Sequence, residues 1–121
     1  MAVKHILVVE DSATDRTFLG EILSKNGYQV SSAENAEEAV TKTKQLKPDL
    51  ILMDIVMPGQ NGFQATRTLS KDDDTKHIPI IICSSKGQET DRIWGLRQGA
   101  KDYLVKPINQ AELLKKIAEI A

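Results

Sequence analysis

The sequence predicts an α/β protein whose parallel sheet is covered by helices on both faces. Apolar segments of strand length alternate five times with segments of helical period along the 121 residues. Two of them, 50–53 and 80–83, are apolar at every position, which is typical of strands buried on both faces of a parallel sheet. Right-handed crossovers then give a doubly wound, five-stranded parallel sheet with five helices and a flavodoxin-like topology.

The five expected strands are short apolar runs rich in β-branched and aliphatic residues. They are HILVV at 5–9, YQVSSA at 28–33, LILM at 50–53, IIIC at 80–83 and YLV at 103–105. A segment of helical period follows each run, so we expect the strands to be joined by helical crossovers.

Capping residues place the first two helices. One begins at Ser12-x-x-Asp15 and ends near Gly27, and the other begins at Asn35 and stops before Pro48. Ser and Asn accept hydrogen bonds from the free amides of a first helical turn, and Pro cannot continue a helix.

The last three helices are predicted from their apolar period. The third opens near Phe63, and the fourth runs over about 88–98, with Ile93 and Leu96 expected in the core. The fifth follows Asn109 and has Leu113, Ile117 and Ile120 on one face.

Composition and charge restrict the class of function. The formal net charge is −1, without a basic block, which argues against binding to nucleic acid or to a membrane surface. The first apolar run is too short for a signal peptide or a membrane span, and Cys83, the single cysteine, is expected to be a small buried apolar residue. We therefore expect one domain over residues 1–121, a cytoplasmic monomer with no membrane insertion.

Polar side chains follow four of the predicted strands. Glu10 and Asp11 follow the first, Asp54 the third, Ser84 the fourth and Lys106 the fifth. The carboxyl ends of parallel strands meet at one edge of the sheet, and clustered carboxylates repel each other unless a cation joins them. Oxygen ligands favour Mg²⁺. The pattern predicts a magnesium site where Asp54 accepts a phosphoryl group, whose oxygens the lysine and the serine hydroxyl bind.

Four motifs in a fixed order carry a family resemblance over the whole chain: VVEDS at 8–12, LMDIVMPGQNG at 52–62, IIICSS at 80–85 and GAKDYLVKP at 99–107. Together they resemble the receiver domains of two-component response regulators, closest to the single-domain chemotaxis type. This resemblance implies a metal site formed by Glu10, Asp11, Asp54 and the backbone carbonyl of Val56. Glu10 stands where many members of that family have Asp.

The resemblance also implies a phosphorylation switch. Asp54 would be the phosphoacceptor, Ser84 the switch hydroxyl, Tyr103 the switch aromatic and Lys106 the phosphoryl-binding lysine, followed by a cis bond to Pro107. Ser84 stands where many members have Thr. Such a protein is not an enzyme of the ordinary kind: it assists its own phosphorylation and dephosphorylation.

Implied partners are a sensor histidine kinase, which donates the phosphoryl group from phosphohistidine, and an unidentified output protein. DIVMPGQNGFQATR and ETDRIWGLRQGAKDYLVKP are similar to regulators of type IV pilus twitching motility. That similarity rests on loop and helix-surface residues such as Trp94 and Arg97.

Structural roles compete with the functional ones for several residues. Lys106 is expected to pair with Asp54 in the metal-free state. Tyr103 is either a half-buried strand aromatic with a hydrated hydroxyl or a switch that moves from exposed to buried. Trp94 either contacts a partner or packs against the sheet.

Three other functions use a similar fold or site. A haloacid-dehalogenase-type phosphatase needs an acid two residues after the nucleophile, where this chain has Val56. A flavin-binding module would bind phosphate at the first loop, where Glu10 and Asp11 repel it. A protein docking module independent of phosphorylation would not need the acidic, serine and lysine set.

Overall fold

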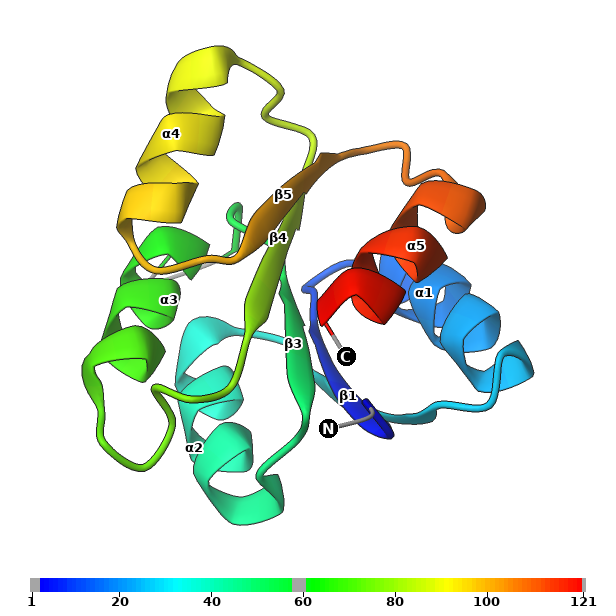
Figure 1. The fold of residues 1–121 in the computed structure, drawn as a ribbon, viewed down its shortest axis with the longest axis horizontal. Helices are drawn as coiled ribbons and strands as arrows, with labels where there is room; N and C mark the ends of the chain where they lie inside the picture. Colours follow the sequence, from blue (N-terminus) through cyan, green and yellow to red (C-terminus); the bar gives the residue numbers. More distant parts are fainter. Residues whose placement is uncertain (1–2, 58–60, 121) are drawn as a thin grey trace.

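A five-stranded parallel sheet forms the centre of the computed structural model, which describes residues 3–57 and 61–120 (Figure 1). The strands lie in the order β2-β1-β3-β4-β5, and every neighbouring pair is parallel. Their bounds are β1 His5–Val9, β2 Gln29–Ala33, β3 Leu50–Met53, β4 Ile80–Ser84 and β5 Asp102–Val105. The predicted doubly wound sheet is confirmed.

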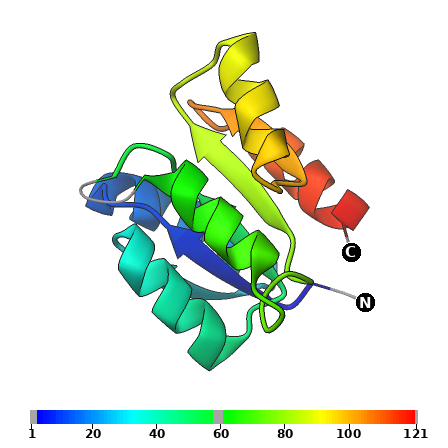
Figure 2. The same ribbon diagram turned by 90° about the vertical axis from the view of Figure 1, so that its left-hand side faces the viewer.

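Five helices cover the two faces of this sheet. Their bounds are α1 Ala13–Lys25, α2 Ala36–Leu46, α3 Gly62–Lys71, α4 Glu89–Arg97 and α5 Gln110–Ile120. Figures 1 and 2 show α1 and α5 on one face and α2, α3 and α4 on the other. None of the helices in residues 3–57 and 61–120 combines the length and apolarity that a membrane span requires.

The core forms on both faces because successive strand residues point in opposite directions. Ile6 and Val8 pack with residues of α1 and α5, whereas Leu7 and Val9 pack with residues of α2 and α3. The same alternation explains why strand β3 is apolar throughout: both of its faces are covered. Cys83 is buried in the first of these clusters, as expected, and its burial raises the pKa of the thiol to about 12.

The helix starts follow the predicted caps. Ser12 Oγ accepts a hydrogen bond from Asp15 N at 3.3 Å, and Asn35 Oδ1 accepts one from Glu38 N at 2.8 Å. Gly99 follows α4 with a φ of +113°, a conformation that favours glycine.

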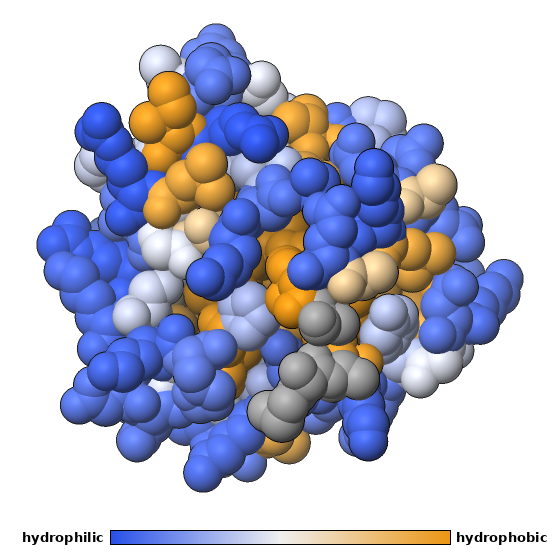
Figure 3. All heavy atoms as spheres, in the orientation of Figure 1, coloured by the Kyte–Doolittle hydropathy of each residue, from blue (hydrophilic) through white to orange (hydrophobic). Residues whose placement is uncertain are grey.

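The surface of α4 corrects one prediction. Ile93 and Leu96, expected in the core, are 44% and 39% exposed, and Trp94 is 51% exposed. The helix instead contacts the sheet through Gly95, where an added Cβ would lie 2.8 Å from Ile82 Cδ1 and 3.1 Å from the Tyr103 ring. This close approach turns the larger neighbours outward, and Figure 3 shows apolar side chains at the surface over α4, at the upper left.

Candidate functional site

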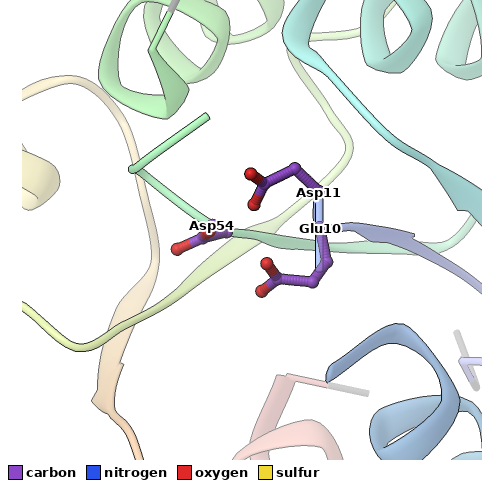
Figure 4. Close-up of side chains that lie close together, drawn as sticks. All are labelled: Glu10, Asp11 and Asp54. Carbon is purple, nitrogen blue, oxygen red and sulfur yellow. The ribbon is translucent and has the colours of Figure 1, made fainter. Parts of the chain in front are cut away.

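Three carboxylates meet at the carboxyl edge of the sheet. Glu10 and Asp11 follow β1 and Asp54 follows β3, and these strands are neighbours whose last residues, Val9 and Met53, are in register. Each carboxylate offers an oxygen within 4.8 Å of the others, and Figure 4 shows the three side chains gathered around one space. Hard oxygen donors at this spacing fit Mg²⁺.

Burial makes this cluster electrostatically unfavourable without a cation. Glu10 is only 2% exposed, and burial raises the pKa of its carboxyl group to about 7, with a further contribution from the charge of Asp54. Burial also raises the pKa of Asp54, which is 6% exposed. Both groups therefore favour the arrival of positive charge.

Lys106 supplies part of that charge: it makes the predicted ion pair with Asp54 and two shorter ones that were not predicted. Its Nζ lies 2.6 Å from Glu10 Oε2 and 2.9 Å from Asp15 Oδ2, whereas Asp54 Oδ1 is 3.9 Å away. Burial lowers the pKa of this lysine, but the hydrogen bonds to Glu10 and Asp15 outweigh that effect and leave it above the ordinary value. The expected pairing with Asp54 is thus the longest of the three, because Glu10 lies closer.

The surroundings of Asp54 place its carboxylate at the end of β3. Its Oδ1 accepts a hydrogen bond from Ile55 N at 2.9 Å. The start of α3 packs directly against its backbone, since an added Cβ on Gly62 would lie 2.0 Å from Asp54 O. Asn61 caps α3, and Gly62 permits the close approach. Residues 58–60 of the LMDIVMPGQNG motif lie outside the described residues.

Ser84 and Tyr103 lie on the neighbouring strands β4 and β5, where Ser84 is in register with Val105 and Tyr103 with Ile82. Ser84 is fully buried, and its Oγ accepts a hydrogen bond from Lys86 N at 3.2 Å. Tyr103 is 2% exposed, and its hydroxyl donates to Lys86 O at 2.5 Å. The ring is therefore buried and its hydroxyl is bonded to the backbone, rather than half-buried with a hydrated hydroxyl. The space that Gly95 leaves accounts for this burial. Movement of this ring as a switch stays a prediction.

Val56 and Pro107 complete the predicted positions. Val56 lies in the loop after β3, and it is 52% exposed. Because this residue is a valine, no acid stands two residues after Asp54. The Lys106-Pro107 peptide bond is cis, as the resemblance implied.

Two residues of α1 were not predicted to belong to the site. The Arg16 guanidinium donates to the backbone carbonyls of Glu10 at 2.8 Å and Asp11 at 3.1 Å, which holds the acidic loop. Asp15, identified from the sequence only as part of a helix start, binds Lys106. No local pattern links residues 15 and 106; only the topology brings them together.

Comparisons with known proteins agree with this geometry. The family model described as "Response regulator receiver domain" matches residues 6–118. Protein PilH of Pseudomonas aeruginosa is 56% identical over 113 residues, 93% of either chain, and chemotaxis protein CheY of Thermotoga maritima is 40% identical over 119 residues, 98% of either chain. The solved structure of chemotaxis protein CheY4 from Vibrio cholerae has a TM-score of 0.91 at 29% identity, covering 99% of this chain and 100% of that one.

Proposed function

Because the chain belongs to the response regulator receiver domain family, we propose that it is a Mg²⁺-dependent switch that is phosphorylated on Asp54 by a sensor histidine kinase. One observation carries the proposal: Asp54 is buried at the end of β3 with two other carboxylates within 4.8 Å and an ammonium group at 3.9 Å. In this proposal residues 1–121 act as one receiver domain.

The chemistry is a transfer between two nucleophiles. A carboxylate oxygen of Asp54 attacks phosphorus, the phosphorus–nitrogen bond to the donor histidine breaks, and the imidazole leaves with the electron pair. Lys106 binds an oxygen of the transferred group, and the Ser84 hydroxyl donates to another. Glu10, Asp11, Asp54 and the Val56 carbonyl would hold Mg²⁺, which supplies neutralising charge when bound.

The cellular role follows from the relatives and the composition. Identity of 56% to PilH supports the predicted type IV pilus branch, and the match to CheY supports control of motility more broadly. In this proposal the protein works in the cytoplasm, between a kinase and an output protein, rather than as an enzyme with turnover. A phosphatase of the haloacid-dehalogenase type is disfavoured because Val56 cannot protonate a leaving group.

The direct test is the mass of the intact protein after incubation with Mg²⁺ and acetyl phosphate. We expect one added phosphate on the wild type and none on Asp54→Ala. Asp49→Ala is the matched control, because it removes an aspartate from the other end of the same strand and should still gain the phosphate. A phosphate retained by Asp54→Ala would refute the proposal, and a wild type that gains none would favour a docking module independent of phosphorylation.

We propose that the surface formed by α4, β5 and α5 is the output face, the surface that binds the output protein. Trp94 and Arg97 are exposed on α4, which packs against β5, and Val105 on β5 is 45% exposed, so apolar and basic groups are available to a partner. Phosphorylation draws the Ser84 hydroxyl toward the phosphoryl group and so alters its bond with the amide of Lys86, whose carbonyl holds the Tyr103 hydroxyl. The signal thus changes the anchoring of a ring that is already buried.

Hydrogen exchange with and without beryllofluoride tests this output face. We expect altered protection across residues 85–106 in the wild type and a much smaller change in Ser84→Ala. Ser84→Ala should still accept phosphate at Asp54. Changes confined to residues 55–62, with none across residues 85–106, would exclude this face.

A further inference from the structure

Asp15 holds one of the hydrogen-bond donors of Lys106 at the edge of the proposed site. The Asp15 carboxylate lies 2.9 Å from Lys106 Nζ, although the two residues are 91 positions apart. A second donor binds Glu10 at 2.6 Å, while Asp54 Oδ1, at 3.9 Å, is beyond hydrogen-bond distance. The ammonium group is thus bound to two carboxylates, and neither is the proposed phosphoacceptor.

The backbones on both sides of this ion pair are fixed by hydrogen bonds. Asp15 N donates to the capping Ser12 Oγ in the first turn of α1, and Lys106 N donates to Ser84 O at 2.8 Å. Arg16 binds the carbonyls that precede this turn. The pair therefore joins the start of α1 to the end of β5, and Lys106 can move toward Asp54 only by loosening its bond with Asp15 or with Glu10.

We propose that Asp15 is a positioning residue that holds Lys106 away from Asp54 and so slows phosphorylation of the resting protein. The inference rests on the proposed function, in which the lysine must reach an oxygen of the group transferred to Asp54. Asp15 is the weaker of the two restraints, because its side chain is 41% exposed and that of Glu10 only 2%.

Exposure also limits the size of the effect. Asp15 and Lys106 line a groove of about 290 Å³ together with Thr14, Phe18, Leu19, Pro107 and Ile108, so one side of the ion pair is open to solvent. Partly exposed ion pairs are weak, and loss of this one corresponds to a change in rate of roughly two- to fivefold.

The test compares rates of phosphorylation by acetyl phosphate in Mg²⁺. The maximal rate of phosphorylation of Asp15→Asn should be about two- to fivefold higher than that of the wild type. The acetyl phosphate concentration that gives half of this rate should not change. Asp15→Glu, which keeps the charge, should return toward the wild-type rate. Glu21→Gln removes a charge from an exposed position of the same helix and should change nothing. An unchanged or slower Asp15→Asn protein would overturn the inference.

A double-mutant cycle separates positioning from a general loss of negative charge. If Asp15 acts through Lys106, Asp15→Asn should have no effect when combined with Lys106→Ala. An equal acceleration in both backgrounds would mean that Asp15 only repels the phosphoryl donor, which contradicts the proposal.

The position of Lys106 provides a readout that does not depend on phosphorylation. In a crystal structure of the metal-free Asp15→Asn protein, Nζ should lie within about 3.2 Å of Asp54 Oδ1. A lysine that stays at its present 3.9 Å would refute the positioning role even if the wild type accepts phosphate normally. A wild type that accepts no phosphate refutes the proposed function instead, and with it any effect on phosphorylation; this structure then tests only whether Asp15 positions Lys106.

Discussion

Two aspartates at opposite ends of strand β3 are held in opposite ways. Asp49 precedes the strand, and its Oδ2 accepts hydrogen bonds from the backbone amides of Lys4 and His5, each at 2.9 Å. These bonds lower the pKa of Asp49, whereas burial raises that of Asp54, which follows the strand. The Asp49 carboxylate, at the amino edge, is stabilised by two backbone amides. The Asp54 carboxylate, at the carboxyl edge, is buried without enough positive charge beside it to offset its burial. The second condition suits a site that binds a cation and then a phosphoryl group.

If this contrast is right, the metal-free protein should lose stability as the pH rises. Burial raises the pKa of Glu10 from its ordinary value of 4.5 to about 7, so the folded state binds more protons than the unfolded state between these limits. The free energy of unfolding should therefore fall between pH 5 and 7.5, on the order of 2 kcal/mol. The contribution of Asp49 to the free energy of unfolding changes with pH in the opposite direction, because its pKa is lowered, but this contribution is lost only below about pH 4.

Urea unfolding in the presence of a chelator measures how the free energy of unfolding depends on pH. In Glu10→Gln, whose side chain cannot ionise, most of this dependence should be lost. A metal-free protein that becomes more stable from pH 5 to 7.5 would show that the carboxyl edge is not under electrostatic strain.

Matched substitutions of the two aspartates should change stability in opposite directions. Asp49→Asn weakens two charge-assisted bonds to backbone amides and should cost about 1 kcal/mol in the free energy of unfolding. Asp54→Asn removes a buried charge that repels Glu10 and should add about 1 kcal/mol to the metal-free protein. Thermal unfolding at neutral pH measures both, and the same sign for the two variants would remove the basis of the contrast.

The smallest effect is expected at Asp11, the exposed member of the acidic cluster. Asp11→Ala should change the stability of the metal-free protein by less than about 0.5 kcal/mol, because the side chain faces solvent. Mg²⁺ should raise the melting temperature of the wild type more than that of this variant, since one of its ligands is gone. Undiminished stabilisation by Mg²⁺ would place the metal elsewhere.

The sequence alone was sufficient to predict the fold and the residues that follow the strands at the carboxyl edge of the sheet. Apolar runs and helix caps predicted every strand and helix to within a few residues, and parallel topology then required Glu10, Asp54, Ser84 and Lys106 to meet at one edge. Their roles in phosphorylation are predictions that the experiments above test.

Features that depend on tertiary distances were not predictable from local patterns. Apolar period suggested that Ile93 and Leu96 face the core, but the contact through Gly95 turns them outward. Opposite charge predicted that Lys106 pairs with Asp54, and that ion pair is present at 3.9 Å, but the closer partners Glu10 and Asp15 were not predicted. In both cases a side chain had several compatible neighbours, and only the packed structure selects among them.

The most direct measurement is a carbon-13 NMR titration of the aspartate side chains in the metal-free protein, repeated with Mg²⁺. Asp49 should titrate below the ordinary range and Asp54 above it, in steps shared with Glu10 because the two groups interact. Mg²⁺ should lower the midpoint of Asp54 and leave that of Asp49 unchanged. An Asp54 midpoint at or below that of Asp49, or one that does not respond to Mg²⁺, would contradict the view that the carboxyl edge of β3 is held ready for a cation.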